Sequence, residues 1–247
     1  MLFEIEGLWL FLTILPIVAF LYASVGHGGA SGYLALMALF AFAPETMKPT
    51  ALLLNLFVAG IAFVHYYHAG FFNAKLFVAF ALASIPLAFV GGMIEVEAGI
   101  YKKILAVLLI FAILKMLNVF GKESIVIRNI KIWQGLLVGG IIGFFSGLIG
   151  IGGGIILTPV ILLLHWGKMK EAAAVSALFI WVNSASGLAG QLTGGAKISA
   201  QAFILVGLAL FGGFFGSYYG SKKFNSNKLR YLLAFVLIIA SVKLFMT

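Results

Sequence analysis

The sequence has no cysteine and very little charge. Without cysteine it can form no disulfide, no thiolate metal site and no cysteine nucleophile. Only 9% of its 247 residues are charged, whereas a soluble domain has about a quarter of its residues charged. With 63% of the residues hydrophobic, the chain could not cover a water-facing surface of this size. The composition therefore predicts an integral membrane protein.

Acidic residues are missing from the middle of every long apolar run, and so are lysine and arginine. A buried carboxylate relay, which many proton-coupled carriers use, is therefore not expected. The sequence has no Walker motif, so we expect no ATP-driven transport by this chain, and we expect no metal or cofactor. The seven acidic residues stand near the ends of runs or in the joints between them: Glu4, Glu6, Glu45, Glu95, Glu97, Glu123 and Glu171.

Basic residues outnumber acidic residues by 16 to 7. They punctuate the apolar runs instead of gathering on one surface, so we do not expect nucleic-acid binding. Their expected role is to set the orientation of the chain in the membrane. A cleavable signal peptide is not expected either, because the first apolar run follows Glu4 and Glu6 rather than lysines.

Ten apolar segments lie between the charged or polar joints. Most of them approach the roughly 20 residues that a helix needs to cross a bilayer. The fold class that we predict is therefore an all-α integral membrane protein with 8 to 10 membrane segments. The segments lie near 8–24, 29–43, 50–67, 74–94, 103–120, 132–149, 153–166, 172–192, 199–220 and 229–246.

Two runs without any charge are too long for one helix each. Residues 7–44 and 132–167 contain no Asp, Glu, Lys or Arg. A continuous helix of either length would extend about 55 Å, against a hydrocarbon core about 30 Å thick. Each run must therefore break inside the membrane. Glycine clusters mark the breaks: Gly26, Gly28 and Gly29 in the first run, and Gly150, Gly152, Gly153 and Gly154 in the second.

The two breaks belong to an internal repeat. A shift of 124 residues superposes residues 26–30 on residues 150–154, and a shift of 128 relates 101–115 to 229–243. A period of this length indicates a duplicated domain rather than a solenoid. We therefore predict two homologous halves with about five apolar segments each. The first covers 1–120, a polar linker covers 121–131, and the second covers 132–247.

The distribution of Lys and Arg favours ten crossings over eight. If all ten segments cross, 11 of these residues lie on one side and 5 on the other. If the short segments after the breaks are re-entrant, the division is 9 against 7. The positive-inside tendency favours the first arrangement, which places both termini outside. Each half then has an odd number of crossings, so the halves would be inverted repeats, as in many secondary transporters.

The glycine breaks are the predicted ligand site. Backbone broken at membrane depth is tolerated only where it is buried in protein or lines a polar cavity. Each segment that resumes after a break presents a helix N-terminus with free N–H groups and partial positive charge, which suits an anion. Two such N-termini are expected to converge on one ligand near the midplane. The alternative is close helix packing through small residues, which one cluster alone would favour.

Polar residues near the breaks complete the predicted site. An imidazole at His27 could donate to an anion or bind a proton, or it could simply hydrogen-bond to backbone. Hydroxyls that follow the breaks could be donors, although such hydroxyls often bond to their own helix. Amides on the next helices could contact the ligand or join helices. The predicted substrate-binding residues are Gly26, His27, Gly28, Gly29, Ser31, Asn55, Gly150, Gly152, Gly153, Gly154, Thr158 and Asn183.

The second break carries a specific resemblance. Residues 150–159 read Gly-Ile-Gly-Gly-Gly-Ile-Ile-Leu-Thr-Pro, and with the partial match at 26–29 they resemble the sulfite exporter TauE/SafE family. The resemblance covers nearly the whole chain. It implies transport of a sulfur-containing anion, such as sulfite, a sulfonate or thiosulfate, across the cytoplasmic membrane. The first half departs from the fuller pattern, because Ala35 stands where the second half has Pro159.

We expect a multi-pass protein of the cell membrane that transports this anion by alternating access and is not an enzyme. Its expected partners are the anion and the lipid bilayer. A coupling ion, either a proton or sodium, is a further candidate partner. A passive anion channel is one alternative. A rhomboid-like intramembrane serine protease is another, because residues 29–32 read Gly-Ala-Ser-Gly. That reading needs a base, from His65, His68 or His165, within about 3 Å of Ser31.

Overall fold

The computed structural model describes residues 7–116 and 127–222, together with Ile238 and Val242. Within these ranges the chain is helical and contains no strand, which confirms the predicted all-α class. Five helices, α3, α4, α6, α8 and α9, are long and apolar enough to cross a membrane. The helices are α1 (Leu8–Ala23), α2 (Ala30–Leu39), α3 (Pro44–His68), α4 (Ala74–Met93), α5 (Ala98–Met116), α6 (Ile132–Ile149), α7 (Gly154–Leu163), α8 (Met169–Thr193) and α9 (Ala202–Lys222).

These helices follow the predicted segments in order. Both long apolar runs break at their glycine clusters, between α1 and α2 and between α6 and α7. Helices α3 and α8 begin earlier than predicted, at Pro44 and Met169, because charged side chains in a first turn can reach the interface. Apart from Ile238 and Val242, the segment predicted at 229–246 lies outside the described residues, and so does most of the linker predicted at 121–131.

The helix bounds repeat along the chain. Helices α1 and α2 begin 124 residues before α6 and α7, respectively. The offset is 125 residues between the starts of α3 and α8, and 128 between those of α4 and α9. The offset between equivalent helices increases only in the connections between helices, as expected if residues were inserted there after a duplication. The division of the chain into two homologous halves stays a prediction, and this spacing supports it.

Glycine stripes join helices of one half to helices of the other. Helix α6 packs on α4, and α9 packs on α1. A Cβ atom at Gly139 would lie 2.2 Å from the carbonyl oxygen of Phe80, and one at Gly216 would lie 2.1 Å from that of Phe20. Only glycine permits such close backbone contact, which is how membrane helices pack tightly. The stripes are Gly135, Gly139, Gly143 and Gly147 on α6 and Gly212, Gly216 and Gly220 on α9.

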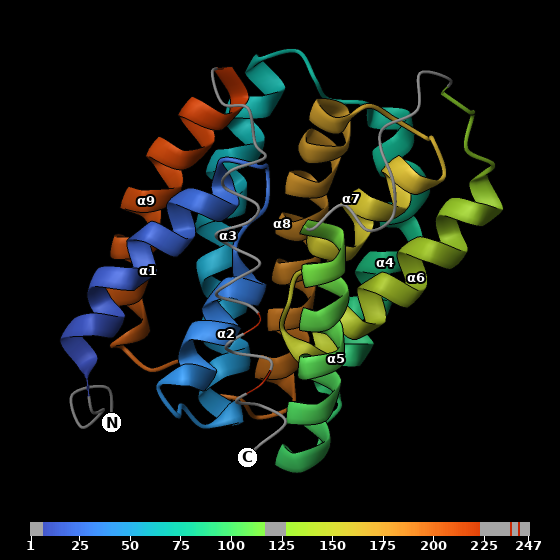
Figure 1. Cartoon of the computed structure of the whole chain (residues 1–247). Helices are drawn as coiled ribbons and strands as arrows, with labels where there is room; N and C mark the ends of the chain where they lie inside the picture. Colours follow the sequence, from blue (N-terminus) through green and yellow to red (C-terminus); the bar gives the residue numbers. More distant parts are fainter. Residues whose placement is uncertain (1–6, 117–126, 223–237, 239–241, 243–247) are drawn as a thin grey trace.

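Helices α3 and α8 cross at the centre of the molecule and run in opposite directions (Figure 1). At the start of α8, the Nζ atom of Lys170 lies 4.8 Å from the ring centroid of Phe71, a residue that follows the end of α3. At the other end, a cavity is lined by Lys48 near the start of α3 and by Gln191 near the end of α8. Since these helices are equivalent in the repeat, their opposite directions are the relation that inverted repeats require.

The short helices α2 and α7 return toward the side where the preceding helix began (Figure 1). Phe40, which follows α2, packs on Phe11 of α1 with ring centroids 5.5 Å apart. In the second half, the Arg128 N–H before α6 donates to the His165 carbonyl after α7, at 2.7 Å. Each glycine break and its short helix therefore lead the chain back across the molecule. This path favours the arrangement with ten crossings.

The two ends of the described molecule differ in charge. The end where α4, α6 and α8 begin, called the basic end here, has six basic side chains and one acidic side chain. The opposite end, called the mixed end, has four basic and three acidic side chains. The basic end carries Lys75, Arg128, Lys131, Lys168, Lys170, Lys222 and Glu171, and the mixed end carries Lys48, Lys102, Lys103, Lys197, Glu45, Glu95 and Glu97.

Cysteine labelling should place the basic end in the cytoplasm. The chain has no cysteine, so Ala74→Cys at the basic end and Ala200→Cys at the mixed end each create a single exposed thiol. A membrane-impermeant maleimide added to intact cells should label Ala200→Cys alone, because the positive-inside tendency predicts that the basic end faces inward. Labelling of both thiols before the cells are broken would contradict the predicted topology. The cysteine-free parent chain is the control.

Candidate functional site

The glycine breaks adopt backbone conformations that suit glycine. In the first break, Gly26 and Gly29 have φ angles of 77° and 102°. In the second, Gly150, Gly152 and Gly153 have φ angles of 86°, 71° and 78°. Other residues adopt this left-handed region only at a cost. The glycines are thus needed for the turns that redirect the chain into α2 and α7.

Both breaks approach the side chain of Asn55 in the middle of α3. A Cβ atom at Gly28 would lie 2.5 Å from Asn55 Oδ1, and one at Gly152 would lie 2.4 Å from Asn55 Nδ2. Either Cβ would also lie 2.9 Å from Ile180 Cγ2 of α8. The two glycine clusters, 124 residues apart, therefore meet at the crossing of α3 and α8. Close backbone approach here is possible only because both positions are glycine.

Asn55 connects the first half-helix to the second half of the chain. Its side chain is fully buried. Oδ1 accepts a hydrogen bond from the Ala30 N–H at 3.0 Å, and Nδ2 donates to Ser184 Oγ at 3.2 Å. The amide thus caps the N-terminus of α2 and fixes α3 to α8. Ser184 was not predicted as a site residue, because one serine in an apolar helix carries no local signal.

The N-terminus of α7 has no such cap. Within the described part of the chain, no hydrogen-bond acceptor is found for the N–H groups of Gly152, Gly153 and Gly154. The first N–H groups of a helix have no partner inside the helix, so they need an outside acceptor. The N–H groups of three consecutive glycines at a buried helix start favour an anion. The two half-helices are therefore unequal, with α2 capped by Asn55 and α7 open.

His27 and Thr158 link the two halves a second time. His27 is 5% exposed, and its Nε2 lies 3.3 Å from Thr158 Oγ1 of α7. Thr158 Oγ1 also lies 2.8 Å from Ser176 Oγ of α8 and 3.2 Å from the Gly154 carbonyl oxygen, to which it can donate. One hydroxyl hydrogen cannot serve all three contacts, so the tautomer of His27 decides the direction of each bond. This network makes hydroxyl groups available beside the first break.

Ser31 does not have the partner that a protease would need. Its hydroxyl donates to the Tyr22 hydroxyl at 3.1 Å, and no histidine side chain of the described residues is hydrogen-bonded to it. The Nδ1 atom of His65 lies 2.8 Å from Ser217 Oγ of α9 instead. A serine nucleophile requires a base within hydrogen-bond reach. The geometry therefore gives no support to the protease alternative.

Asn183 is buried on α8, but no described hydrogen bond joins it to either break. Its Nδ2 donates to the Phe179 carbonyl of its own helix at 2.8 Å. Its Oδ1 has no hydrogen-bond partner among the described residues. Of the predicted site residues, Asn55 therefore lies between the breaks, whereas the hydrogen bonding of Asn183 is local.

Comparison with known proteins gives a match over almost the whole chain. The family model described as "Sulfite exporter TauE/SafE" matches residues 10–244. The "Probable membrane transporter protein y4hK" of Sinorhizobium fredii is 34% identical over 233 residues, which are 92% of this chain and 94% of that protein. The "Probable membrane transporter protein MJ0441" of Methanocaldococcus jannaschii is 32% identical over 124 residues, covering 49% of this chain and 46% of that protein. No solved structure matches.

Proposed function

The chain belongs to the sulfite exporter TauE/SafE family, and from that premise we propose that it carries a small sulfur-containing anion by alternating access. It is a membrane transporter of that family with several spanning helices. Sulfite, thiosulfate and small sulfonates are the proposed substrates. We also propose the cell membrane as its location, with the basic end in the cytoplasm.

The convergence of the two breaks on Asn55 supports the proposal most strongly. An anion that meets the open N-terminus of α7 would accept hydrogen bonds from the Gly152, Gly153 and Gly154 N–H groups. The buried polar side chains of the described residues are serine, threonine, asparagine, glutamine and histidine, with no lysine or arginine among them. Helix ends can stabilise a partly buried anion by up to about 2 kcal/mol each. The negative charge would therefore be held by backbone dipoles and neutral donors.

Two equivalent contacts on opposite sides of Asn55 favour a carrier over a channel. Gly26 lies against Ala173 at the start of α8, and Gly150 lies against Lys48 at the start of α3. A Cβ atom at Gly26 would lie 2.5 Å from Ala173 Cβ, and one at Gly150 would lie 3.1 Å from Lys48 Cα. Residues 48 and 173 are equivalent in the repeat. Rocking of the halves would open one contact while the other stays closed.

Transport by the purified protein in proteoliposomes tests the proposal. Radiolabelled sulfite, thiosulfate and ethanesulfonate should enter with saturable kinetics, and unlabelled anion inside should accelerate entry by counterflow. Proton and sodium gradients, imposed separately, identify the coupling ion by the one that drives accumulation. Flux that neither saturates nor shows counterflow would indicate a channel. Folded, inserted protein that moves none of these anions would refute the substrate class.

A further inference from the structure

Among the buried residues that the structure describes, His27 alone has a side chain that ordinarily changes its charge near neutral pH. It is 5% exposed and lies inside the first glycine break. The other buried polar side chains there are serine, threonine, asparagine and glutamine, and a tyrosine ordinarily loses its proton only at about pH 10. Ionisable groups at membrane depth are rare and commonly belong to proton pathways. The imidazole is therefore a candidate for binding a transported proton.

One hydroxyl group connects the imidazole of His27 to the open half-helix. Its Nε2 lies 3.3 Å from Thr158 Oγ1, and that oxygen lies 3.2 Å from the carbonyl oxygen of Gly154, the first residue of α7. A neutral imidazole without a proton on Nε2 accepts the Thr158 hydrogen. A protonated imidazole donates through Nε2 instead, and Thr158 then donates to Gly154 or to Ser176 Oγ. Protonation therefore reverses a hydrogen bond beside the uncapped start of α7.

A proton on His27 would offset the charge of an anion at the second break. The buried donors that the structure describes around the breaks are neutral, and an uncompensated charge is costly in a protein interior. A cation and an anion that bind close together each raise the affinity of the other by the same factor. The proton and the anion are therefore expected to enter the molecule as a pair.

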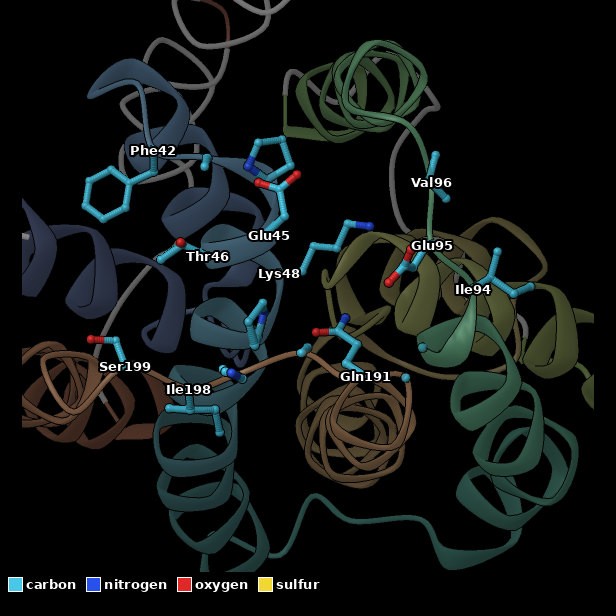
Figure 2. Close-up of a pocket in the computed structure, with 18 of the residues that line it drawn as sticks. Phe42, Glu45, Thr46, Lys48, Ile94, Glu95, Val96, Gln191, Ile198 and Ser199 are labelled. Atoms are coloured by element: carbon cyan, nitrogen blue, oxygen red, sulfur yellow. The ribbon is translucent and has the colours of Figure 1, made fainter. Parts of the chain in front are cut away.

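The two contacts that would close the carrier also control access to His27. Its neighbour Gly26 packs on Ala173 at the start of α8, so opening of this contact exposes the imidazole toward the basic end. At the mixed end, a cavity of about 770 Å³ extends to Lys48, whose backbone packs on Gly150 of the second break (Figure 2). Because the proposed rocking opens one contact at a time, the proton and the anion would be exposed to the same side together.

Other titratable side chains on the elements around His27 are tyrosines or lie toward the ends of the molecule. Lys170 Nζ donates to the Ser221 carbonyl oxygen at 3.2 Å. Glu171 Oε1 accepts from Asn73 Nδ2. Helix α7 has no titratable side chain. Those of the other elements are Tyr22 of α1, Tyr33 of α2, Glu45, Lys48, His65, Tyr66, Tyr67 and His68 of α3, Lys170 and Glu171 of α8, and Tyr218, Tyr219 and Lys222 of α9.

We propose that His27 binds the coupling proton of this carrier, at the imidazole that faces Thr158, and that one proton moves with each anion. This assignment rests on the proposed anion transport and names the coupling ion for it. The imidazole takes a proton from water on the open side and returns it to water on the other, and no other bond forms or breaks. The repeat supplies no second site, because the residues equivalent to His27 and Thr158, at the offset of 124, are Ile151 and Leu34.

Equilibrium binding to the purified full chain, measured over the neutral pH range, tests the site. Thiosulfate and ethanesulfonate are the probes, because both stay ionised there whereas sulfite itself titrates. Above the pH at which the imidazole titrates, affinity should fall about tenfold for each pH unit, as linkage requires when one proton binds with the anion. In His27→Gln the affinity should not change with pH. The matched control is His65→Gln, which should keep the parent slope, because His65 Nδ1 likewise lies 2.8 Å from a hydroxyl, Ser217 Oγ.

A second variant tests the assignment without altering His27. The chain has four histidines, and replacement of His65, His68 and His165 by glutamine leaves His27 alone. This variant should keep the full pH slope and should take up one proton from weak buffer for each anion bound, as a pH-indicator dye reports. Loss of the slope in this variant would overturn the assignment, and so would a slope that survives in His27→Gln.

The parent chain also decides the matter by itself. An affinity that does not change with pH, together with no proton uptake on binding, would overturn the proton site. Thiosulfate counterflow at equal pH on both sides of the membrane distinguishes this failure from that of the proposed function. Counterflow with an affinity that is independent of pH refutes the proton site alone, whereas absence of all anion binding and flux refutes anion transport itself.

Discussion

Gly153→Ala is expected to reduce anion flux about 100-fold, because misplacing a substrate by about 1 Å can have that effect. Gly153 is the N-cap residue of α7 and has a φ angle of 78°. A Cβ atom there would lie 2.7 Å from Ile142 Cγ2 and 2.9 Å from Phe179 Cε1. The added methyl group must therefore push the half-helix away from α6 and α8. The N–H groups that face the proposed anion would move with it.

Counterflow of sulfite in proteoliposomes, normalised to the amount of inserted protein, measures this effect. The control is Gly70→Ala, because Gly70 has a φ angle of 79° but nothing within 4 Å of an added Cβ. The two positions have nearly the same φ angle, but only an added Cβ at Gly153 would be crowded. Gly70→Ala should therefore retain its flux. Full flux through Gly153→Ala would count against the glycine site, and equal losses in both would point to general strain.

Asn55→Asp is expected to reduce flux about 100-fold as well, since juxtaposed like charges cost several kcal/mol. The carboxylate would still accept the hydrogen bond from the Ala30 N–H, so the cap of α2 would be kept. It would also bring negative charge between the breaks, where the proposed anion must bind. The loss of the donor to Ser184 Oγ would leave that contact unmade. We therefore expect inserted protein with an intact N-terminal cap on α2 and little transport.

The measurement pairs sulfite counterflow with the thermal unfolding temperature. Gln134→Glu is the matched control, because Gln134 Oε1 likewise accepts a backbone hydrogen bond at a helix start, from the Lys131 N–H before α6 at 3.1 Å. It lies at the basic end, away from the breaks. Its flux should stay within about twofold of the parent chain, as for most surface changes. Asn55→Asp protein that transports normally would show that the anion does not bind between the breaks.

The sequence by itself determined the membrane class, the succession of helices and the positions of the breaks. These features follow from local physics. A run of 38 residues without charge is longer than one helix that crosses a bilayer, so it must break, and glycine adopts the backbone conformations of such a break most readily. The match between residues 26–30 and 150–154 predicted the repeat, and the helix bounds follow the same offset.

Only part of the site could be predicted from the sequence. Asn55 was predicted as one of several amides, and the structure alone distinguishes it from Asn183, whose hydrogen bonding is local. The helix periodicity of α3 and α8 places many side chains at similar depth. Which of them faces a glycine break depends on how the two helices cross. Ser184 and Tyr22 could not be predicted as partners for the same reason.

Only the tertiary structure decided that helices of one half pack on helices of the other. The close contacts of α4 with α6 and of α1 with α9 join residues far apart in the chain. The same holds for the contact of Lys48 with the ring of Tyr101 and for the cavity that Lys48 and Gln191 line. Glycines, a lysine near a helix start and a buried glutamine have no local pattern that reveals a common partner. Their association is set by the packing of whole helices, in which each contact depends on the fit of all the others.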